Sequence, residues 1–311
     1  GSRMKLDVLC MGEPLLEFNQ IPDRGKNTYR AGFGGDTSNT AISVARQGLS
    51  SGFLSKVGND TFGRQFLELW QREGVECSNV EQHAEAPTGI YFVTHDANGH
   101  HFTYYRSNSA ACLMRSEDVP TKLLAQAKVL HLSAITQAIS NSFCDTAFAA
   151  IECAQENGVL ISYDTNLRLK LWTLELARKV IHRTVPLCDV LLPSLEDATA
   201  LTGLENPEAI TDYYLKLGAK LVVLKQGDQG VRVANGKKVC EISGHAVQTI
   251  DATGAGDTFD GAFLSEWLRL GDPFVAAEYA NAAAALSTMQ YGAVDSIPYR
   301  SSVDEFLRRK L

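Results

Sequence analysis

The chain lacks the signals of several protein classes. Its seven cysteines never occur as Cys-x-x-Cys, so the sequence indicates neither a disulfide framework nor a zinc site. No apolar run reaches about 18 residues and no secretory signal stretch is present, so we expect no membrane partner. A reducing, cytoplasmic location is the expectation. Gly1–Arg3, which precede Met4, look like an expression remnant.

Basic residues are also in the minority. There are 29 lysines and arginines against 36 acidic residues, which gives a formal net charge of −7 at pH 7. The longest basic run is Arg308–Lys310, so we expect no nucleic-acid partner. A Walker-type loop, Gly-x-x-x-x-Gly-Lys-Ser/Thr, is absent as well, and a P-loop nucleotide-binding protein is therefore not indicated.

What is present is enough apolar residue for a large core, because 45% of the chain is hydrophobic. Short apolar runs alternate with amphipathic helical segments, a pattern typical of a parallel sheet with helices on both faces. Strands are predicted near Val8–Met11, Gly52–Val57, Val129–Ser133, Leu160–Asp164, Val190–Leu192 and Leu221–Lys225. Helices are predicted near 37–47, 61–73, 142–157, 174–184, 195–203 and 207–217. We expect an α/β fold in which residues 4–311 form a single domain.

One region breaks this alternation. Thr88–Thr94 and His101–Arg106 flank the turn Asp96–Gly99 with no helix between them, which predicts a β-hairpin. Residues 14–31 are also partly extended. Together with residues of about 85–108, they would form a small antiparallel β lid on the main domain.

The lid concentrates candidate binding residues. Alternation along its second strand places Tyr104 and Arg106 on one face and Tyr105 on the other, and Tyr91 lies on the first strand. Taken alone, such aromatics are usually packing residues. A second arginine, Arg168, follows a predicted strand, where open α/β sheets place their ligands. Two guanidinium groups suit a carboxylate, so the pair predicts a small acidic substrate.

The most informative stretch is 250–261, Ile-Asp-Ala-Thr-Gly-Ala-Gly-Asp-Thr-Phe-Asp-Gly. Small residues lead into an apolar stripe of helical spacing, and the free N–H groups at such a helix start suit a phosphate. Asp257 would lie on the first turn, beside the anion. For an isolated Gly-x-Gly-Asp, a capping role is an equal alternative. The second acid, Asp251, and the hydroxyls of Thr253 and Thr258 favour a functional site.

Residues 251–259 resemble the C-terminal signature of the ribokinase-like, pfkB-type carbohydrate kinases. A second family motif, Gly-Phe-Gly-Gly-Asp-Thr-Ser-Asn-Thr-Ala, occupies 32–41, about 220 residues earlier. The similarity extends from Leu6 to about Pro298. It implies a ribokinase-like fold, a three-layer parallel sheet with helices on both faces and a β lid. It also implies an ATP-dependent sugar kinase that uses Mg²⁺.

The resemblance also assigns roles at the sugar site. Asp257 would be the catalytic base, and the backbone N–H groups of Gly254, Ala255 and Gly256 would form an anion hole. The lid Tyr-Tyr-Arg and the run from Asp164 to Trp172 are more similar to 2-keto-3-deoxygluconate kinases than to fructokinases. In that case Asp257 would meet a sugar acid held by Gly35, Asn39, Tyr91, Tyr104, Arg106, Asn166 and Arg168.

On the nucleotide side, Lys225–Gly230 resembles the family's ATP loop, although a plain hairpin turn is the alternative. The expected ATP contacts are Ser194, Lys225, Gly227, Gly230, Thr253, Gly254, Gly256 and Asn281. This chain has Ser194-Leu-Glu-Asp197 where the family has Asn-x-x-Glu, so Asp197 would act on Mg²⁺ indirectly. A monovalent cation such as K⁺ would touch Asp251, Thr253, Gly292 and Ser296. Asp251 as a loop-capping residue is the alternative.

Three questions stay open at this level. A fructokinase or another sugar, sugar-acid or nucleoside kinase would use the same scaffold. A non-catalytic sugar-binding protein would not need Asp257 beside an intact anion hole. The sequence does not distinguish the gluconate from the galactonate epimer of the substrate. We also expect the apolar lid strands to bury against a second copy, giving a homodimer or a higher homo-oligomer.

Overall fold

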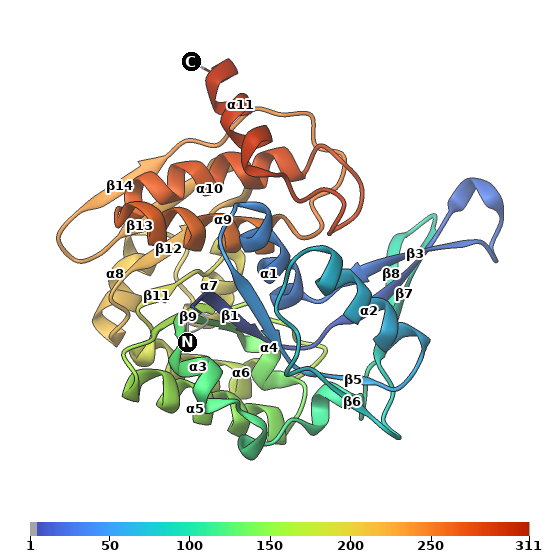
Figure 1. Ribbon diagram of the computed structural model, residues 1–311. Coiled ribbons are helices and arrows are strands. Elements are labelled where there is room, and N and C mark those ends of the chain that lie inside the picture. Colours follow the sequence, from blue (N-terminus) through green and yellow to red (C-terminus); the bar gives the residue numbers. More distant parts are fainter. Residues whose placement is uncertain (1–4, 311) are drawn as a thin grey trace.

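The computed structural model describes residues 5–310, so the predicted expression remnant, Gly1–Arg3, lies outside the described residues. An eight-stranded sheet forms the middle of the main body, and a four-stranded sheet projects from its side (Figure 1). Within the described chain, no helix is long and apolar enough to cross a membrane.

The large sheet has the strand order β14-β13-β12-β11-β10-β9-β1-β4. Its strands are β1 (Leu6–Met11), β4 (Ser51–Leu54), β9 (Ala127–Ser133), β10 (Leu160–Asp164), β11 (Val190–Leu191), β12 (Val222–Lys225), β13 (Val231–Ala234) and β14 (Val239–Ile242). The strands from β12 to β4 pair in parallel, whereas β13 and β14 add an antiparallel edge. The predicted parallel sheet is confirmed, with this antiparallel extension.

The predicted strand Gly52–Val57 is wrong in extent. The chain leaves the large sheet after β4, and β5 (Lys56–Gly58) pairs instead with β6 (Glu81–His83) in a separate two-stranded sheet. Every residue of β4 and β5 is buried. A run that is buried on both faces carries no periodic signal, so the sequence could not show the change of partner.

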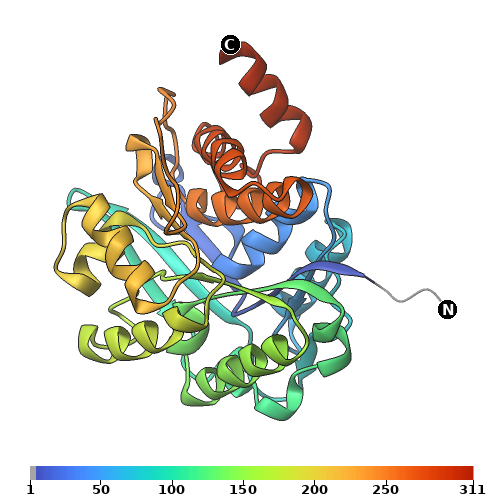
Figure 2. The same ribbon diagram turned by 90° about the vertical axis from the view of Figure 1, so that its left-hand side faces the viewer.

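Helices cover both faces of the large sheet (Figure 2). Alternation along β1 explains the layers, because Val8 and Cys10 belong to one apolar core and Leu9 and Met11 to the other. The first core packs against α1 (Asp36–Arg46), α2 (Thr61–Arg72), α9 (Ala255–Leu270), α10 (Pro273–Ser287) and α11 (Arg300–Lys310). The second packs against α3 (Thr121–Ala125), α4 (Ala134–Ala138), α5 (Asn141–Glu156), α6 (Leu174–Thr184), α7 (Leu195–Thr202) and α8 (Pro207–Leu217).

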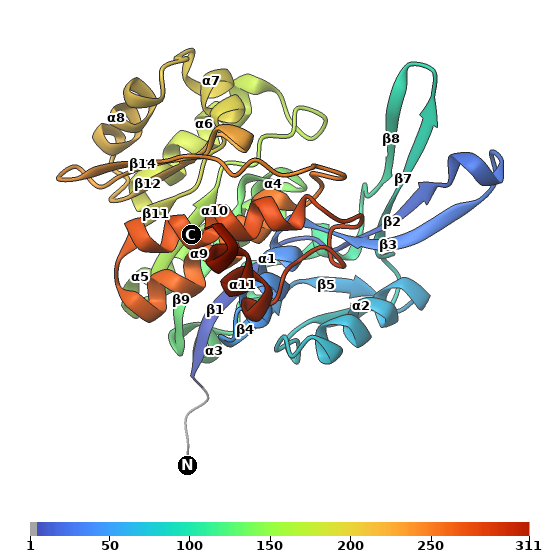
Figure 3. The ribbon, with the colours of Figure 1, turned by 90° about the horizontal axis from the view of Figure 1, so that it is seen from above.

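The lid is the four-stranded sheet of β2 (Leu15–Gln20), β3 (Tyr29–Gly34), β7 (Gly89–Asp96) and β8 (Gly99–Tyr105), and it extends away from the main body (Figure 3). The pairs β2–β3 and β7–β8 are antiparallel, as predicted. The middle pair, β2–β7, is parallel. A parallel pair needs a long crossover, and here α1, β4–β6 and α2 supply it.

The helices α1 and α9 lie against each other (Figure 1). A Cβ on Gly261 would lie 2.5 Å from the Cβ of Ser43, so glycine is needed for this approach. Ser43 donates a hydrogen bond to the carbonyl of Thr258 at 3.0 Å, and Thr40 donates to that of Asp257 at 3.3 Å. Two motifs about 220 residues apart in sequence are thereby joined.

Candidate active site

Helix α9 begins at a glycine turn. Gly254 is its N-cap and adopts a left-handed φ of 78° that favours glycine, and its carbonyl accepts the N–H of Thr258 at 2.9 Å. The N–H of Ala255 is taken by the carbonyl of Ala252 at 3.2 Å. Within the described backbone, no acceptor takes the N–H groups of Gly256 and Asp257. These two donors and the helix dipole suit an anion.

Asp257 lies half-buried on the first turn of α9. Burial raises its pKa well above the ordinary value, and the nearby carboxylates of Asp36 and Asp164 raise it further, while Lys225 and Arg168 act in the opposite direction. A carboxyl group with a raised pKa is a stronger base and is suited to accept a proton.

Lys225, at the end of β12, points inward. Its Nζ donates to Asp164 Oδ2 at 2.7 Å and to Asp260 Oδ1 at 2.9 Å. Burial on its own would raise the pKa of Asp164, but the ammonium of Lys225 lowers it strongly. The lysine predicted to contact ATP therefore joins the end of β10 to helix α9.

The start of α1 forms the side of the candidate site that faces the start of α9. Gly35 has a φ of 101°, and a Cβ there would lie 2.6 Å from the carbonyl of Glu13. The carboxylate of Asp36 accepts hydrogen bonds from Ser133, from Asn166 Nδ2 at 2.9 Å and from the N–H of Thr37 at 2.8 Å. One turn along the helix, Asn39 is 3% exposed, and its Oδ1 has no hydrogen-bond partner in the described chain.

The lid brings its predicted residues together. The rings of Tyr91 and Tyr104 stack with centroids 5.4 Å apart, and the guanidinium of Arg106 lies 5.4 Å from the Tyr104 ring. The predicted shared face of Tyr104 and Arg106 is confirmed. The hydroxyl of Tyr91 donates to Glu17 at 3.0 Å. Arg106 donates from Nε and Nη2 to Glu13, at 2.9 and 2.7 Å.

Asn166 and Arg168 occupy the loop that follows β10. Asn166 contacts Asp36 as described, and its N–H donates to Asp164 Oδ1 at 2.9 Å. Arg168 is exposed, and its guanidinium donates to the carbonyl of Leu167 at 3.2 Å. From this loop the positive charge of Arg168 lowers the pKa of Asp257.

The site thus combines a carboxyl group of raised pKa, Asp257 at the start of α9, with polar residues of the lid. The family model described as pfkB family carbohydrate kinase matches residues 5–300. The chain belongs to this family. Relatives of the pfkB chain include 2-dehydro-3-deoxygluconokinase of Bacillus subtilis (strain 168), 33% identical over 98% of this chain and 96% of the relative. Probable fructokinase-7 of Arabidopsis thaliana is 32% identical, over 96% and 92%.

Solved structures agree with the pfkB assignment. A putative ribokinase II from E. coli in complex with ATP and Mg²⁺ has a TM-score of 0.90 and 26% sequence identity, covering 98% of this chain and 99% of that one. This likeness confirms the ribokinase-like fold, and the family makes the chain a carbohydrate kinase, a phosphotransferase.

In this kinase the predicted ATP loop is the turn between β12 and β13. Gly230 has a φ of 99°, and a Cβ there would lie 1.8 Å from the carbonyl of Ile242. Gly227 opens the turn, also with positive φ, 58°. The amide of Asn281, in α10, donates to the carbonyl of Ser243 at 2.9 Å. The hairpin alternative is therefore correct as geometry, and nucleotide contact of this loop stays a prediction.

The residues predicted to hold a monovalent cation are adjacent. Asp251 accepts the N–H of Thr253 at Oδ1, 3.0 Å, and that of Gly292 at Oδ2, 3.2 Å. The hydroxyl oxygen of Ser296 is buried and has no hydrogen-bond partner in the chain from 5 to 310. The geometry supports Asp251 as a loop-capping residue, and the unpartnered oxygen fits a hard cation as well.

Ser194 and Asp197 have local tasks. Ser194 is the N-cap of α7, where its Oγ accepts the N–H of Asp197 at 3.1 Å. Asp197 Oδ2 accepts from the hydroxyl of Thr165 and the N–H of Leu167, both at 3.1 Å. The acid of the altered magnesium motif thus holds the loop that carries Asn166. An indirect action of Asp197 on Mg²⁺ stays a prediction.

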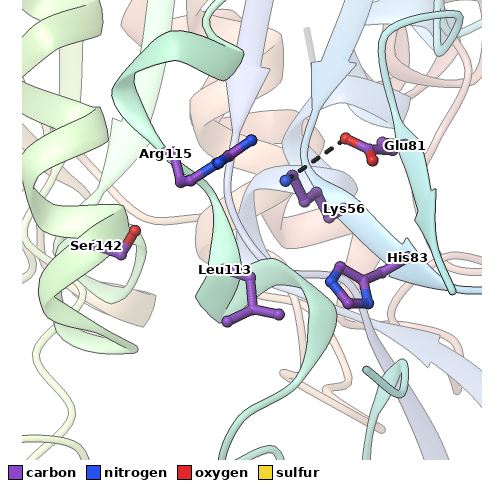
Figure 4. Close-up of a pocket in the computed structure, with 6 residues that line it drawn as sticks. All are labelled: Lys56, Glu81, His83, Leu113, Arg115 and Ser142. Atoms are coloured by element: carbon purple, nitrogen blue, oxygen red, sulfur yellow. Dashed lines mark ion pairs between the residues drawn. The ribbon is translucent and has the colours of Figure 1, made fainter. Parts of the chain in front are cut away.

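A separate cavity of about 420 Å³ contains none of the predicted site residues. It is lined by Lys56, Glu81, His83, Leu113, Arg115 and Ser142 (Figure 4). Lys56 is already paired there, with Glu81 at 3.5 Å and with Asp118 at 3.0 Å.

Sequence reasoning missed three functional candidates: Glu13, Asp260 and Lys170. Glu13 is 2% exposed and follows a buried strand, a position from which it could have been suspected. Asp260 is one turn after Asp257. Lys170 donates to the carbonyl of Phe102 in the lid at 3.2 Å; it gave no sequence signal beyond its charge, because loop-to-lid contacts depend on the tertiary fold.

Proposed function

We propose that this kinase transfers the γ-phosphoryl group of ATP to the C6 hydroxyl of 2-keto-3-deoxygluconate. One observation carries the choice of an acidic sugar. The ring of Tyr104 has the guanidinium of Arg106 at 5.4 Å and the ammonium of Lys170, also at 5.4 Å. Arg168 adds a third cation from the same loop as Lys170. Cations grouped in this way favour a carboxylate-bearing ligand.

Arg106 keeps a free donor for such a ligand. Its Nε and Nη2 are used by Glu13, and its Nη1 has no acceptor among the described residues. Tyr104 and Asn39 would complete the sugar contacts through their polar atoms. The relative named 2-dehydro-3-deoxygluconokinase supports this substrate class.

In the proposed reaction, Asp257 accepts the proton of the C6 hydroxyl. The C6 oxygen forms a bond to the γ-phosphorus, and the bond between the γ-phosphorus and the bridging oxygen breaks, so that ADP leaves. The N–H groups of Gly256 and Asp257 would donate to the transferred phosphoryl group. Such a reaction depends on positioning, and the contact between α1 and α9 holds the start of α1, which is predicted to bind the sugar, in a fixed position relative to the base.

Mg²⁺ fits this donor set as a partner of ATP, because it is usually held by phosphates and water with few protein ligands. It would neutralise charge on the β- and γ-phosphates, and Asp197 would act on it through water. Asp251, Thr253, Gly292 and Ser296 would hold K⁺ behind the anion hole. The adenine would lie near Asn281 and the loop of Gly227 and Gly230.

A fructokinase is the second candidate, and a specific observation favours it. Glu13 is buried against Arg106, so the net charge that the lid arginine offers to a ligand is reduced. A neutral ketose would not suffer from this compensation. A fructokinase is also among the relatives.

The deciding experiment measures ADP release with MgATP over 2-keto-3-deoxygluconate, 2-keto-3-deoxygalactonate, fructose, ribose, gluconate and adenosine. We expect the highest kcat/KM with a 2-keto-3-deoxy acid. Preference for fructose would replace the acidic substrate and keep Asp257 as base. An absence of turnover with all six would contradict the proposal.

A further inference from the structure

Three buried or half-buried aspartates converge beneath the start of α9. One carboxylate oxygen from each of Asp164, Asp257 and Asp260 lies within 4.8 Å of the others, a spacing that could hold a metal ion. The ammonium of Lys225 already lies between two of them, at 2.7 Å from Asp164 and 2.9 Å from Asp260. The cation of this cluster is therefore a side chain.

Lys225 lies directly behind the glycine turn. A Cβ on Gly256 would be 3.7 Å from its Nζ, an ordinary van der Waals distance. One of its partners, Asp164, begins the loop of Asn166 and Arg168; the other, Asp260, is one turn beyond Asp257. A single ammonium thus connects the loop predicted to bind the sugar with the helix that carries the base.

Resting on the proposed function, we propose that Lys225 is a positioning residue for phosphoryl transfer. Clamped between Asp164 and Asp260, it holds the β10 loop and the start of α9 together and supplies a fixed positive charge next to Asp257. This differs from a role as an ATP ligand, because two of its three N–H donors already serve the carboxylates.

The charges around the cluster explain why the lysine matters. His131 Nε2 lies 4.0 Å from Asp260, but burial lowers the pKa of His131 to about 4, so this imidazole is neutral near pH 7 and cannot replace the ammonium. Burial raises the pKa of Asp260 well above its usual value, and the charge of Asp164 raises it further, whereas the ammonium of Lys225 lowers it. The ammonium of Lys225 is therefore the positive charge that offsets the carboxylates of this cluster.

Asp257 is influenced from several elements. Asp36 on α1 and Asp164 on β10 raise its pKa, whereas Lys225 on β12 and Arg168 in the β10 loop lower it. Loss of the Lys225 charge removes one of the charges that lower the pKa of Asp257, so this pKa should rise. The acidic limb of the kcat–pH profile should then move to higher pH, because a larger fraction of the base is protonated.

The test is Lys225→Gln, which removes the charge and keeps a hydrogen-bond donor. With the best acceptor of the panel, we expect kcat to fall at least tenfold, KM for ATP and sugar to change less than threefold, and the acidic limb to rise by at least half a pH unit. Lys225→Arg should recover part of kcat and restore the limb. Lys220→Gln is the matched control. Lys220 lies just before the start of β12, and its exposed ammonium pairs with Asp189 at 3.1 Å.

An unpaired buried Asp164 could prevent the Lys225→Gln variant from folding. The double variant Asp164→Asn with Lys225→Gln removes both charges and keeps the polar contacts, so it should melt closer to the wild type. We expect its kcat to stay at least tenfold low. Wild-type kcat and pH profile in either folded variant would overturn the proposal, as would a tenfold rise in KM for ATP at unchanged kcat.

The two proposals fail in different ways. If the wild type prefers a neutral sugar, the Lys225 test runs unchanged with that sugar. If the wild type turns over none of the panel, the proposed function fails first. In that event the acidic titration of Asp257, followed by carboxyl NMR in the wild type and in Lys225→Gln, still tests the charge effect, and an unmoved titration would overturn it.

Discussion

Arg106 of the lid and Glu13, which follows β1, form an ion pair in which two guanidinium nitrogens, Nε at 2.9 Å and Nη2 at 2.7 Å, donate to the same carboxylate oxygen. Ser109 donates to the other oxygen of Glu13. The side chain of Glu13 is 1% exposed and that of Arg106 is 11% exposed. The lid is thus fixed to the main body by a buried charge pair, close to the predicted sugar site.

We predict that Arg106→Ala is strongly destabilising, because it leaves the carboxylate of Glu13 buried without its partner. Breaking such a pair costs about 3–5 kcal/mol. The double variant Glu13→Gln with Arg106→Met removes both charges and should recover most of that loss. Urea unfolding of the three proteins checks this. Equal stabilities of the single and double variants would contradict the unpaired carboxylate of Glu13 as the cause of the loss.

Because loss of Arg106 is expected to destabilise the protein, the binding of an acidic substrate is better tested at Arg168. Arg168 is exposed, and its guanidinium donates to the carbonyl of its neighbour Leu167, so Arg168→Met should fold normally. We expect this variant to raise KM for a 2-keto-3-deoxy acid by roughly 10–150-fold, because loss of a charged hydrogen bond costs about 1.5–3 kcal/mol. KM for fructose should change little.

The control for Arg168→Met is Arg64→Met, which removes an exposed arginine from α2. It should leave both KM values as in the wild type. Unchanged KM for the sugar acid in Arg168→Met, measured with saturating MgATP, would remove Arg168 from the proposed carboxylate clamp.

Asp257 should control the pH dependence of turnover. Burial and the neighbouring acids raise its pKa well above the usual 3.8, so the base loses its function as pH falls through that raised value. The acidic limb of kcat should therefore lie above the range of an ordinary aspartate. Asp257→Asn should lower kcat by about 10²–10⁴-fold without reducing stability, because it removes a desolvated carboxyl. A loss of less than threefold would exclude Asp257 as the base.

The sequence was sufficient for the scaffold and the main motifs. Periodicity predicted the helices from α5 to α8 within a residue or two, because each has an apolar stripe and defined ends. The Gly254–Asp257 turn was found because small residues leading into an apolar helical stripe, with an acid on its first turn, form a specific pattern. The resemblance, more than the pattern, assigned the substrate.

What the sequence could not give are the pairings between distant charges. Lys225 is 61 residues from Asp164 and 35 from Asp260, and Arg106 is 93 from Glu13. Charged side chains carry no periodic signal that names a partner. Only the order of strands in the sheet brings these charges together. The sequence therefore predicted Lys225 as a nucleotide contact and gave no sign of its position between two aspartates.

Asp60 should contribute stability that depends on pH. It caps α2, where Oδ1 accepts from the N–H of Gly63 and the hydroxyl of Thr88, both at 2.8 Å, and Oδ2 from the N–H of Thr88 at 3.0 Å. Burial opposes ionisation, but these hydrogen bonds lower the pKa of Asp60 below 3.8. The folded pKa lies below the unfolded one, so the stabilisation is complete above about pH 4 and is lost as pH falls through the folded value.

The corresponding variant is Asp60→Ala. At pH 7 it should lose about 0.5–2 kcal/mol, the usual value for a helix cap, and the difference from the wild type should shrink below about pH 4. Unfolding by urea at several pH values measures both effects. A difference that stays constant down to about pH 2.5 would contradict the proposed titration.

The lid should also govern association between copies. One of its faces exposes aromatic rings: Tyr105 is 61% and Tyr29 is 38% exposed, and both pack edge-on against Phe92. We predict a homodimer that buries this face, because aromatic surface at a sheet edge favours self-association. Light scattering after size exclusion should give twice the chain mass of 33.9 kDa, and Tyr105→Asp should give the monomer. Tyr213→Asp, which charges another exposed aromatic, in α8, should remain dimeric, and a wild type that is monomeric across a wide concentration range would refute the lid interface.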